Sequence, residues 1–505
     1  MAKRKDWKEK YELIDGLGEG GNAKVYLVKC LENNRNFALK ELVSRGTEKK
    51  GRFIDEINII TNNCENINGI IPIIDFSAEQ YWYVMPVAKP AIDYIFENKL
   101  NITEIVMGTL ELCKTLETLH EKGVSHRDIK PSNIYYYEGQ FCLGDFGLVD
   151  FPENENDFTR SDKGLGAIFT IAPEMKRNPK KADGKKADVF SLAKTMWMFL
   201  TKDEKGFDGV YNFLDESHSL RLFKQAKDFH LVELDELLID STANDPNARP
   251  TMKEFKDRLE YWLEVCSDIY KSQSSDWNFL SKLLFGANPP TACVWREPQE
   301  IVNVLNIVGS TPAYNHMIFS DRGGLDFSHA KMADEKGCIK VYDTLNGCYI
   351  LKPKRLLFES FKDNLRWNYF MLEIDNLKPI LQENIISDYE YLVEDMPSNY
   401  VSAQFADYGV YDYDEGTPLP DGFQKVYRYT KGKFLIVLKT GPYNGINGTY
   451  DGRHGDCSAD EFRNYIENLI KFYEQLYKYA KQDEQLKHLS DEDIEERFSN
   501  LEEIK

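Results

Sequence analysis

The chain has 505 residues, of which 42% are hydrophobic and 13% aromatic, and its formal net charge is −20. This length favours two or three domains with their own cores, and the apolar content excludes an intrinsically disordered chain. The negative charge disfavours binding to nucleic acid or to an anionic membrane. No apolar run is long enough to span a membrane, no signal peptide is expected, and the cysteines form no CxxC pair, so we expect a cytoplasmic protein.

The first motif along the chain is a glycine-rich stretch, GLGEGGNAKV, at residues 16–25. Counted from Gly16 it is a GxGxxG dinucleotide-binding turn, which must lead into a helix. Counted from Gly18 it is a glycine flap within a β-hairpin, with Ala23 in the place of the third glycine. The run at residues 23–30 is β-branched and aromatic without a helical period, so it predicts a strand and favours the hairpin.

The surrounding segments predict an antiparallel meander of three strands, at residues 11–18, 23–30 and 36–43. The third strand carries Lys40, and a helix is expected at residues 52–60, where apolar residues recur at helical spacing. Glu56 lies on that helix and could form an ion pair with Lys40. Taken alone, both residues would be read as surface charges.

Three ordered motifs follow: HRDIKPSN at residues 126–133, DFG at 145–147 and APE at 172–174. With these motifs the chain resembles the eukaryotic-type (Hanks-type) serine/threonine protein kinases over about residues 8–270. The resemblance implies an α+β fold, namely the bilobal protein-kinase fold with a small β-rich N-lobe and a mainly helical C-lobe. A separate α+β domain that resembles no family we know is expected after it.

The resemblance implies ATP as cofactor, with Mg²⁺ as the metal and Mn²⁺ as its substitute. Phosphoryl transfer depends on positioning and charge neutralisation, which requires acids, amides and lysines. In the family pattern Asp128 accepts the proton of the substrate hydroxyl, whereas Asn133 and Asp145 hold the metal. The implied catalytic set is Lys40, Glu56, Asp128, Lys130, Asn133 and Asp145.

The same resemblance implies a nucleotide pocket between flap, hinge and catalytic loop. Its expected residues are Leu17, Gly18, Gly20, Ala23, Val25, Ala38, Lys40, Met85, Val87, Ala88 and Tyr135. Met85 would be the gatekeeper, and Tyr135 replaces the usual aliphatic floor of the adenine site. Ala167 stands where a threonine usually bridges the catalytic Asp and Lys, which puts full activity in question.

The segment DIKPSN resembles kinases that act on Ser and Thr of protein substrates. Arg127 precedes Asp128, an arrangement in which a phosphorylated activation loop pairs with the arginine. The expected regulatory residues are Arg127 and the acceptors Thr159, Ser161 and Thr170. Arg127 could instead pair with an acid of that loop. Glu174 is expected to pair with Arg249, Asp188 to hold the catalytic-loop backbone, and a transient homodimer to serve trans-autophosphorylation.

The expected domain plan is a kinase domain at 8–270 (N-lobe 8–86, C-lobe 89–270), a linker with a short helix at 271–292, an α+β domain at 293–482 and an acidic tail at 483–505. Hairpins are expected at residues 338–352 and 425–445, around Asn-Gly and Lys-Gly turns. A capping box, SADE at 458–461, predicts a closing helix. The preceding RHGDC, with His454, Asp456 and Cys457, fits a polar turn better than a cysteine nucleophile.

We therefore expect an ATP-dependent protein serine/threonine kinase that autophosphorylates its activation loop and is controlled or targeted by its C-terminal domain. Soluble kinases of this build occur in bacterial stress and phage-defence systems. The alternatives are a pseudokinase scaffold that binds nucleotide without efficient transfer, and a small-molecule phosphotransferase. No direct contact with nucleic acid or membrane is expected.

Overall fold

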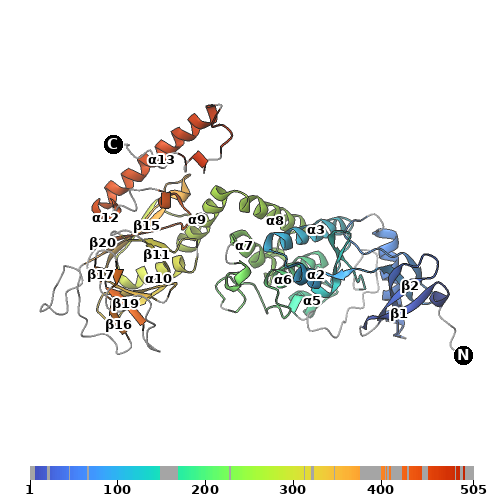
Figure 1. The fold of residues 1–505 in the computed structure, drawn as a ribbon. Coiled ribbons are helices and arrows are strands. Elements are labelled where there is room, and N and C mark those ends of the chain that lie inside the picture. The colour runs from blue at the N-terminus through green and yellow to red at the C-terminus, as the bar shows by residue number, and fades with distance from the viewer. Residues whose placement is uncertain are drawn as a thin grey trace. The chain divides into compact units, whose positions relative to one another are not determined.

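A computed structural model of the chain shows two compact units, at residues 1–267 and 268–505 (Figure 1). Each unit is described by itself below. The structure describes residues 6–19, 23–44, 46–64, 67–147, 169–215, 217–226, 229–311, 313–319, 324–345, 347–375, 400–403, 405–406, 409–410, 424–428, 432–445, 453–483, 485–489, 493–494 and 497.

The first unit begins with a five-stranded antiparallel sheet of order β1-β2-β3-β5-β4. Gly16 and Gly18 lie within β1 and face Tyr26 and Val25 of β2, so the glycine stretch belongs to a hairpin, as the strand after it predicted. The helix α1 follows β3 and continues into a π-helical turn, η2. Their bounds are β1 (Tyr11–Glu19), β2 (Ala23–Cys30), β3 (Asn36–Leu42), α1 (Thr47–Asn58), η2 (Ile59–Asn63), β4 (Asp75–Ser77) and β5 (Trp82–Pro86).

A short 3-10 helix, η1 (Asp6–Glu9), covers the sheet face opposite α1. Trp7 is buried against Val28 and Trp82, and its Nε1 donates to Glu41 at 3.1 Å. The indole of Trp82 donates to the carboxylate of Asp6 at 2.6 Å. The residues before β1 therefore complete the core of this lobe.

The rest of the first unit is mainly helical. Its centre is α6, which is buried from Ala187 to Thr201, as expected of a helix surrounded by others. The elements are β6 (Lys89–Pro90), α2 (Ala91–Asn98), α3 (Ile102–Glu121), η3 (Pro131–Asn133), β7 (Ile134–Tyr137), β8 (Gln140–Leu143), α5 (Pro173–Arg177), α6 (Gly184–Thr201), η4 (Leu220–Leu222), η5 (Lys224–Ala226), α7 (Val232–Ser241), η6 (Pro246–Ala248) and α8 (Met252–Cys266). The expected bilobal architecture is confirmed.

The second unit is built on a mixed sheet of ten strands in the order β16-β19-β13-β12-β11-β10-β20-β15-β14-β9. Helices α9 and α10 pack on one face of its central strands, and α13 packs on the other. Its elements are α9 (Ile269–Phe285), β9 (Ala292–Trp295), α10 (Pro298–Gly309), β10 (His316–Ile318), β11 (Gly324–Met332), β12 (Ile339–Asp343), β13 (Gly347–Leu351), β14 (Pro353–Glu359), η7 (Leu365–Trp367), β15 (Tyr369–Ile374), β16 (Tyr400–Ala403), β17 (Phe405–Ala406), β18 (Gly409–Val410), β19 (Gln424–Arg428), β20 (Gly432–Val437), η8 (Pro442–Gly445), α12 (Arg453–Asp456) and α13 (Ala459–Gln482).

The boundary between the units differs from the expected one. The segment expected as a linker with a short helix, 271–292, lies largely within α9, which has 17 residues. Trp277 and Leu280 of α9 are fully buried in the core of the second unit. This helix is therefore part of that unit's fold, and the division falls after Ser267.

Two further predictions for the second unit differ from the structure. The hairpin expected at residues 425–445 is wrong: β19 pairs with β13 and β16, whereas β20 pairs with β10 and β15. Phe434 to Val437 are all buried, so β20 needs cover on both faces and lies inside the sheet. The segment expected as an acidic tail, 483–505, includes Leu486 and Ile494, which are buried with Ala480.

The expected hairpin at 338–352 is present as β12 and β13, and the capping box opens α13. Just before it, His454 is fully buried and its ring lies 6.1 Å from that of Phe462. Among the described helices, none is both long and apolar enough to cross a membrane.

Candidate active site

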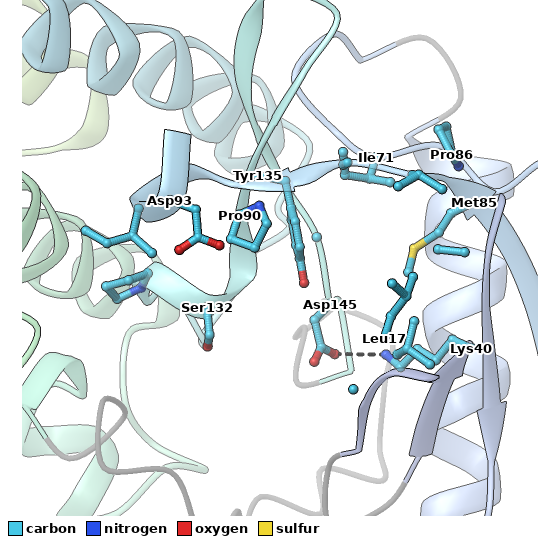
Figure 2. A pocket seen from close by; sticks show the side chains of 18 of the residues that line it. Leu17, Lys40, Ile71, Met85, Pro86, Pro90, Asp93, Ser132, Tyr135 and Asp145 are labelled. Atoms are coloured by element: carbon cyan, nitrogen blue, oxygen red, sulfur yellow. Dashed lines mark hydrogen bonds and ion pairs between the residues drawn. The ribbon is translucent and has the colours of Figure 1, made fainter. Parts of the chain in front are cut away.

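A cavity of about 880 Å³ lies in the first unit between the five-stranded sheet and the helical part (Figure 2). Of the residues predicted to bind nucleotide, Ala23 does not line it, and Gly20 lies outside the described residues. Ile71, Tyr83 and Gly144 also line it, although no sequence motif singled them out. The predicted residues that do line it are Leu17, Gly18, Val25, Ala38, Lys40, Met85, Val87, Ala88 and Tyr135.

Lys40 forms the charged wall of this cavity. Its Nζ lies 2.8 Å from Oε1 and 3.0 Å from Oε2 of Glu56, and 3.2 Å from Oδ1 of Asp145. Figure 2 shows the contact between Lys40 and Asp145 as a dashed line. Burial opposes the charging of Lys40, but the carboxylates of Asp145 and Glu56 raise its pKa well above the usual value. The amine is thus held as a fixed cation.

Asp145 contacts Lys40 and also lines the cavity, where its carboxylate could bind a metal ion. It has a φ of 60°, in the left-handed region that non-glycine residues rarely adopt, and such strain is concentrated at functional sites. The Lys40 charge lowers the pKa of Asp145, although partial desolvation beside the cavity wall opposes this. Its side chain is 45% exposed, so the carboxylate is both ionised and open to the cavity.

The catalytic-loop residues meet at the carboxylate of Asp128. Its Oδ2 accepts from Nζ of Lys130 at 2.7 Å and from Nδ2 of Asn133 at 2.9 Å. Asn133 is buried and also donates to the main-chain oxygen of Asp128. Burial raises the pKa of Asp128, while Lys130 opposes this rise. A carboxylate with a raised pKa accepts a proton more readily near neutral pH.

The backbone of this loop is fixed by Asp188 of α6, as expected. Its carboxylate accepts from the main-chain N–H groups of His126 and Arg127, each at 2.7 Å, and from Nε2 of His120 at 3.0 Å. Arg127 has a φ of 64°. The fully buried carboxylate of Asp188 thus accepts three hydrogen bonds, two of them from the backbone of the strained turn at Arg127. These bonds stabilise the turn and hold the neighbouring Asp128 in place.

Tyr135 and Gly144 form the floor of the cavity, and Figure 2 shows the Tyr135 ring between Pro90 and Asp145. A Cβ atom placed on Gly144 would lie 2.8 Å from Cε2 of Tyr135, which is closer than van der Waals contact allows. Burial, and next the Asp145 charge, raise the pKa of Tyr135. The tyrosine ring therefore occupies space that only a glycine at position 144 leaves open.

Away from the cavity, the expected pair of Glu174 and Arg249 is present and bidentate, at 2.6 and 2.9 Å. Arg127 donates through Nη2 to the main-chain oxygen of Pro179 at 2.8 Å. Thr170 is buried. The other expected acceptors, Thr159 and Ser161, and the departure at Ala167 lie outside the described residues.

The donor set suits a hard divalent cation. Asp145 lines the cavity, whereas Asn133 belongs to the neighbouring η3 and is not among the lining residues. The main-chain oxygen of Asn133 accepts from the N–H of Gly144, the residue before Asp145, at 2.9 Å. Mg²⁺ uses few protein ligands and completes its shell with phosphate oxygens and water. The residues present therefore fit a metal that binds together with a nucleotide.

Comparison with known proteins gives one family match: residues 11–259 match the model described as "Protein kinase domain". No family model matches the C-terminal half. The chain is 27% identical over 333 residues to "3-phosphoinositide-dependent protein kinase B" of Dictyostelium discoideum, covering 60% of this chain and 36% of that protein.

Two fungal proteins are also similar. The chain is 30% identical over 192 residues to "Serine/threonine-protein kinase STE20" of Candida glabrata, covering 37% of this chain and 20% of that protein. It is 28% identical over 180 residues to "Serine/threonine-protein kinase shk1/pak1" of Schizosaccharomyces pombe, covering 35% of this chain and 27% of that protein. The chain therefore spans well under half the length of these relatives.

Proposed function

Because residues 11–259 are a protein kinase domain, we propose that the chain transfers the γ-phosphoryl group of ATP to Ser or Thr hydroxyls of protein substrates. Two of the similar proteins are named as serine/threonine-protein kinases, and the family uses ATP with a divalent metal. Mg²⁺ is the metal proposed here, held by Asp145 and Asn133. When bound, it would neutralise phosphate charge.

The observation that carries the proposal is the convergence of Lys130 and Asn133 on Oδ2 of Asp128. This carboxylate is oriented to accept the proton of a substrate hydroxyl as its oxygen bonds to the γ-phosphorus. The bond from the γ-phosphorus to the β–γ bridging oxygen breaks, and ADP leaves. Lys40 and Lys130 supply positive charge to the phosphate oxygens.

The test is incubation of the protein with Mg²⁺ and γ-labelled ATP, alone and with a cell lysate. We expect label in the wild type, and about a hundredfold less or below with Asp128→Asn, because general-base catalysis contributes on this scale. Asp128→Asn keeps the size of the side chain and can still accept from Lys130. Equal label in both proteins would contradict the proposal.

The same experiment separates the alternatives. Nucleotide binding without Asp128-dependent transfer would favour a pseudokinase scaffold. Label recovered only in the small-molecule fraction would favour a small-molecule phosphotransferase. Identification of phosphoserine and phosphothreonine in labelled protein supports the serine/threonine specificity proposed here.

We further propose that activation-loop autophosphorylation, at Thr159 or Ser161, occurs between two copies, and that the second unit controls or targets the kinase. Placement in a bacterial stress or phage-defence system is proposed from architecture alone. A tagged Asp128→Asn protein, incubated with untagged wild type, should gain phosphate on Thr159 or Ser161. Phosphate confined to the wild-type copy would show that the reaction occurs within one chain.

A further inference from the structure

Tyr83 lies at the back of the cavity, on β5. In the antiparallel register it stands directly opposite Lys40 of β3, and it precedes Met85 by two residues on the same strand. Both Tyr83 and Met85 line the cavity. Alternate residues of a strand share a face, so Tyr83 and Met85 lie on the same side of the sheet. On that side Tyr83 packs with Phe53 of α1, the helix that carries Glu56.

The Tyr83 hydroxyl donates to Oε1 of Glu56 at 2.9 Å, and this is the oxygen that Nζ of Lys40 approaches at 2.8 Å. Glu56 and Tyr83 are each 2% exposed. The Tyr83 ring also packs on Phe53 of α1, with ring centroids 5.4 Å apart. Tyr83 therefore fixes α1 at two points, one polar and one apolar.

The need for this contact follows from the position of Lys40 between two acids. Its amine contacts the carboxylates of both Glu56 and Asp145. The position of the Glu56 carboxylate therefore determines the position of the amine. A buried carboxylate requires donors for its lone pairs. Burial raises the pKa of Glu56, and the charges and hydroxyls that face it are those of Lys40, Asp145, Tyr83 and Tyr135.

We propose that Tyr83 is a positioning residue for the phosphate-binding lysine: its hydroxyl orients Glu56, and Glu56 in turn holds Lys40 toward the cavity. This inference rests on the proposed function, because it assigns Lys40 to the phosphates of ATP. In this role Tyr83 acts through Glu56 and Lys40.

The first arm of the test is Tyr83→Phe, which keeps the ring on Phe53 and removes only the hydroxyl. We expect kcat/KM for ATP to fall about tenfold, as for a lost hydrogen bond to a charged group, with KM for the protein substrate unchanged. The affinity for ATP, measured by calorimetry, should fall as well. No change in either quantity would overturn the proposal.

The second arm asks whether Tyr83 acts through Glu56. In a Glu56→Ala background, Tyr83→Phe should change the affinity for ATP and kcat/KM by less than about twofold, because the acceptor is gone. A fall of the same size in both backgrounds would mean that the Tyr83 hydroxyl acts independently of Glu56, and would overturn the proposal.

The matched control is Tyr211→Phe. Tyr211 is also buried and donates to a carboxylate, that of Asp235, at 2.6 Å, but it lies in the helical core away from the cavity. We expect it to lower Tm and to leave kcat/KM for ATP within about twofold. If the wild type shows no Asp128-dependent transfer, the proposed function fails, and the ATP affinities still decide the role of Tyr83.

Discussion

At the cavity floor, the residue type at position 144 depends on the side chain of Tyr135. The Tyr135 ring lies where any side chain at position 144 would begin, and Gly144 directly precedes Asp145. Gly144 is not among the glycines with positive φ. The glycine is therefore required for space rather than for backbone conformation, and the requirement should vanish when the tyrosine is made smaller.

This gives a prediction for paired substitutions. Gly144→Ala should raise KM for ATP about tenfold, because a methyl group forces the Tyr135 ring into the nucleotide cavity. The double variant with Tyr135→Leu should return KM to within about threefold of the wild type, a coupling expected for residues in contact. Steady-state kinetics of the four proteins decides this, and equal effects of Gly144→Ala in both backgrounds would contradict the steric account.

At the scale of single elements, α6 carries a lysine, Lys194, within its buried stretch from Ala187 to Thr201. Lys194 donates to the main-chain oxygens of Phe207 and Gly209 at 2.8 and 2.7 Å, and it lies 3.3 Å from the Phe207 ring centroid. Burial lowers the pKa of Lys194 to about 7. The unfolded chain, with a lysine pKa of about 10.4, therefore binds more protons between these two values.

Stability should then depend on pH with a defined sign. The free energy of unfolding gains from this group as pH rises from about 7 to about 10, by up to about 1.4 kcal/mol per pH unit, because the neutral amine is favoured only in the folded state. Lys194→Met should lose this rise, so its stability relative to the wild type should be lower near pH 9 than near pH 7.

The measurement is urea unfolding at both pH values, followed by tryptophan fluorescence. Lys185→Met is the control, because Lys185 lies on the same helix but is exposed. A difference between Lys194→Met and the wild type that stays constant with pH would show that Lys194 is protonated in the fold throughout this range.

The elements also show what the sequence can and cannot predict. Asp128 and Asp145 stand in short linear motifs, so their type and spacing were enough to predict one site. Lys40 taken alone would be read as a surface charge, and it was assigned to the site only through the family resemblance that these motifs carry. Tyr83 acts through the register of β5 against β3, and register is set by the whole sheet. The pairing of β19 and β20 with distant strands was not predicted, because a Lys-Gly turn indicates only a local hairpin.

At the scale of the whole molecule, the division into units depends on α9. Residues 271–292 were expected to be a linker with a short helix, but Trp277 and Leu280 bury their side chains in the core built on the ten-stranded sheet. Whether an amphipathic segment is linker or core depends on the partner surface, which the sequence does not display locally. The family match ends before this helix, at residue 259.

This assignment predicts how fragments behave. A fragment of residues 268–505 should unfold in one cooperative transition. A fragment of residues 293–505 should melt more than about 10 °C lower or fail to fold, because loss of a buried tryptophan alone costs about 3–5 kcal/mol. Calorimetry of the two fragments checks this, and equal melting temperatures would place α9 outside the second unit.

The short helix η1 has a practical consequence for the preparation of the first unit alone. A fragment cut to the matched family range, 11–259, would lack Trp7 and Asp6 and would leave the indole of Trp82 facing solvent with its hydrogen bond unmade. Such a fragment would expose an aromatic surface that η1 covers in the full chain. Expression trials and crystallisation should therefore start from residue 6 or earlier, because self-association and weak yield of the shorter fragment would not be properties of the whole chain.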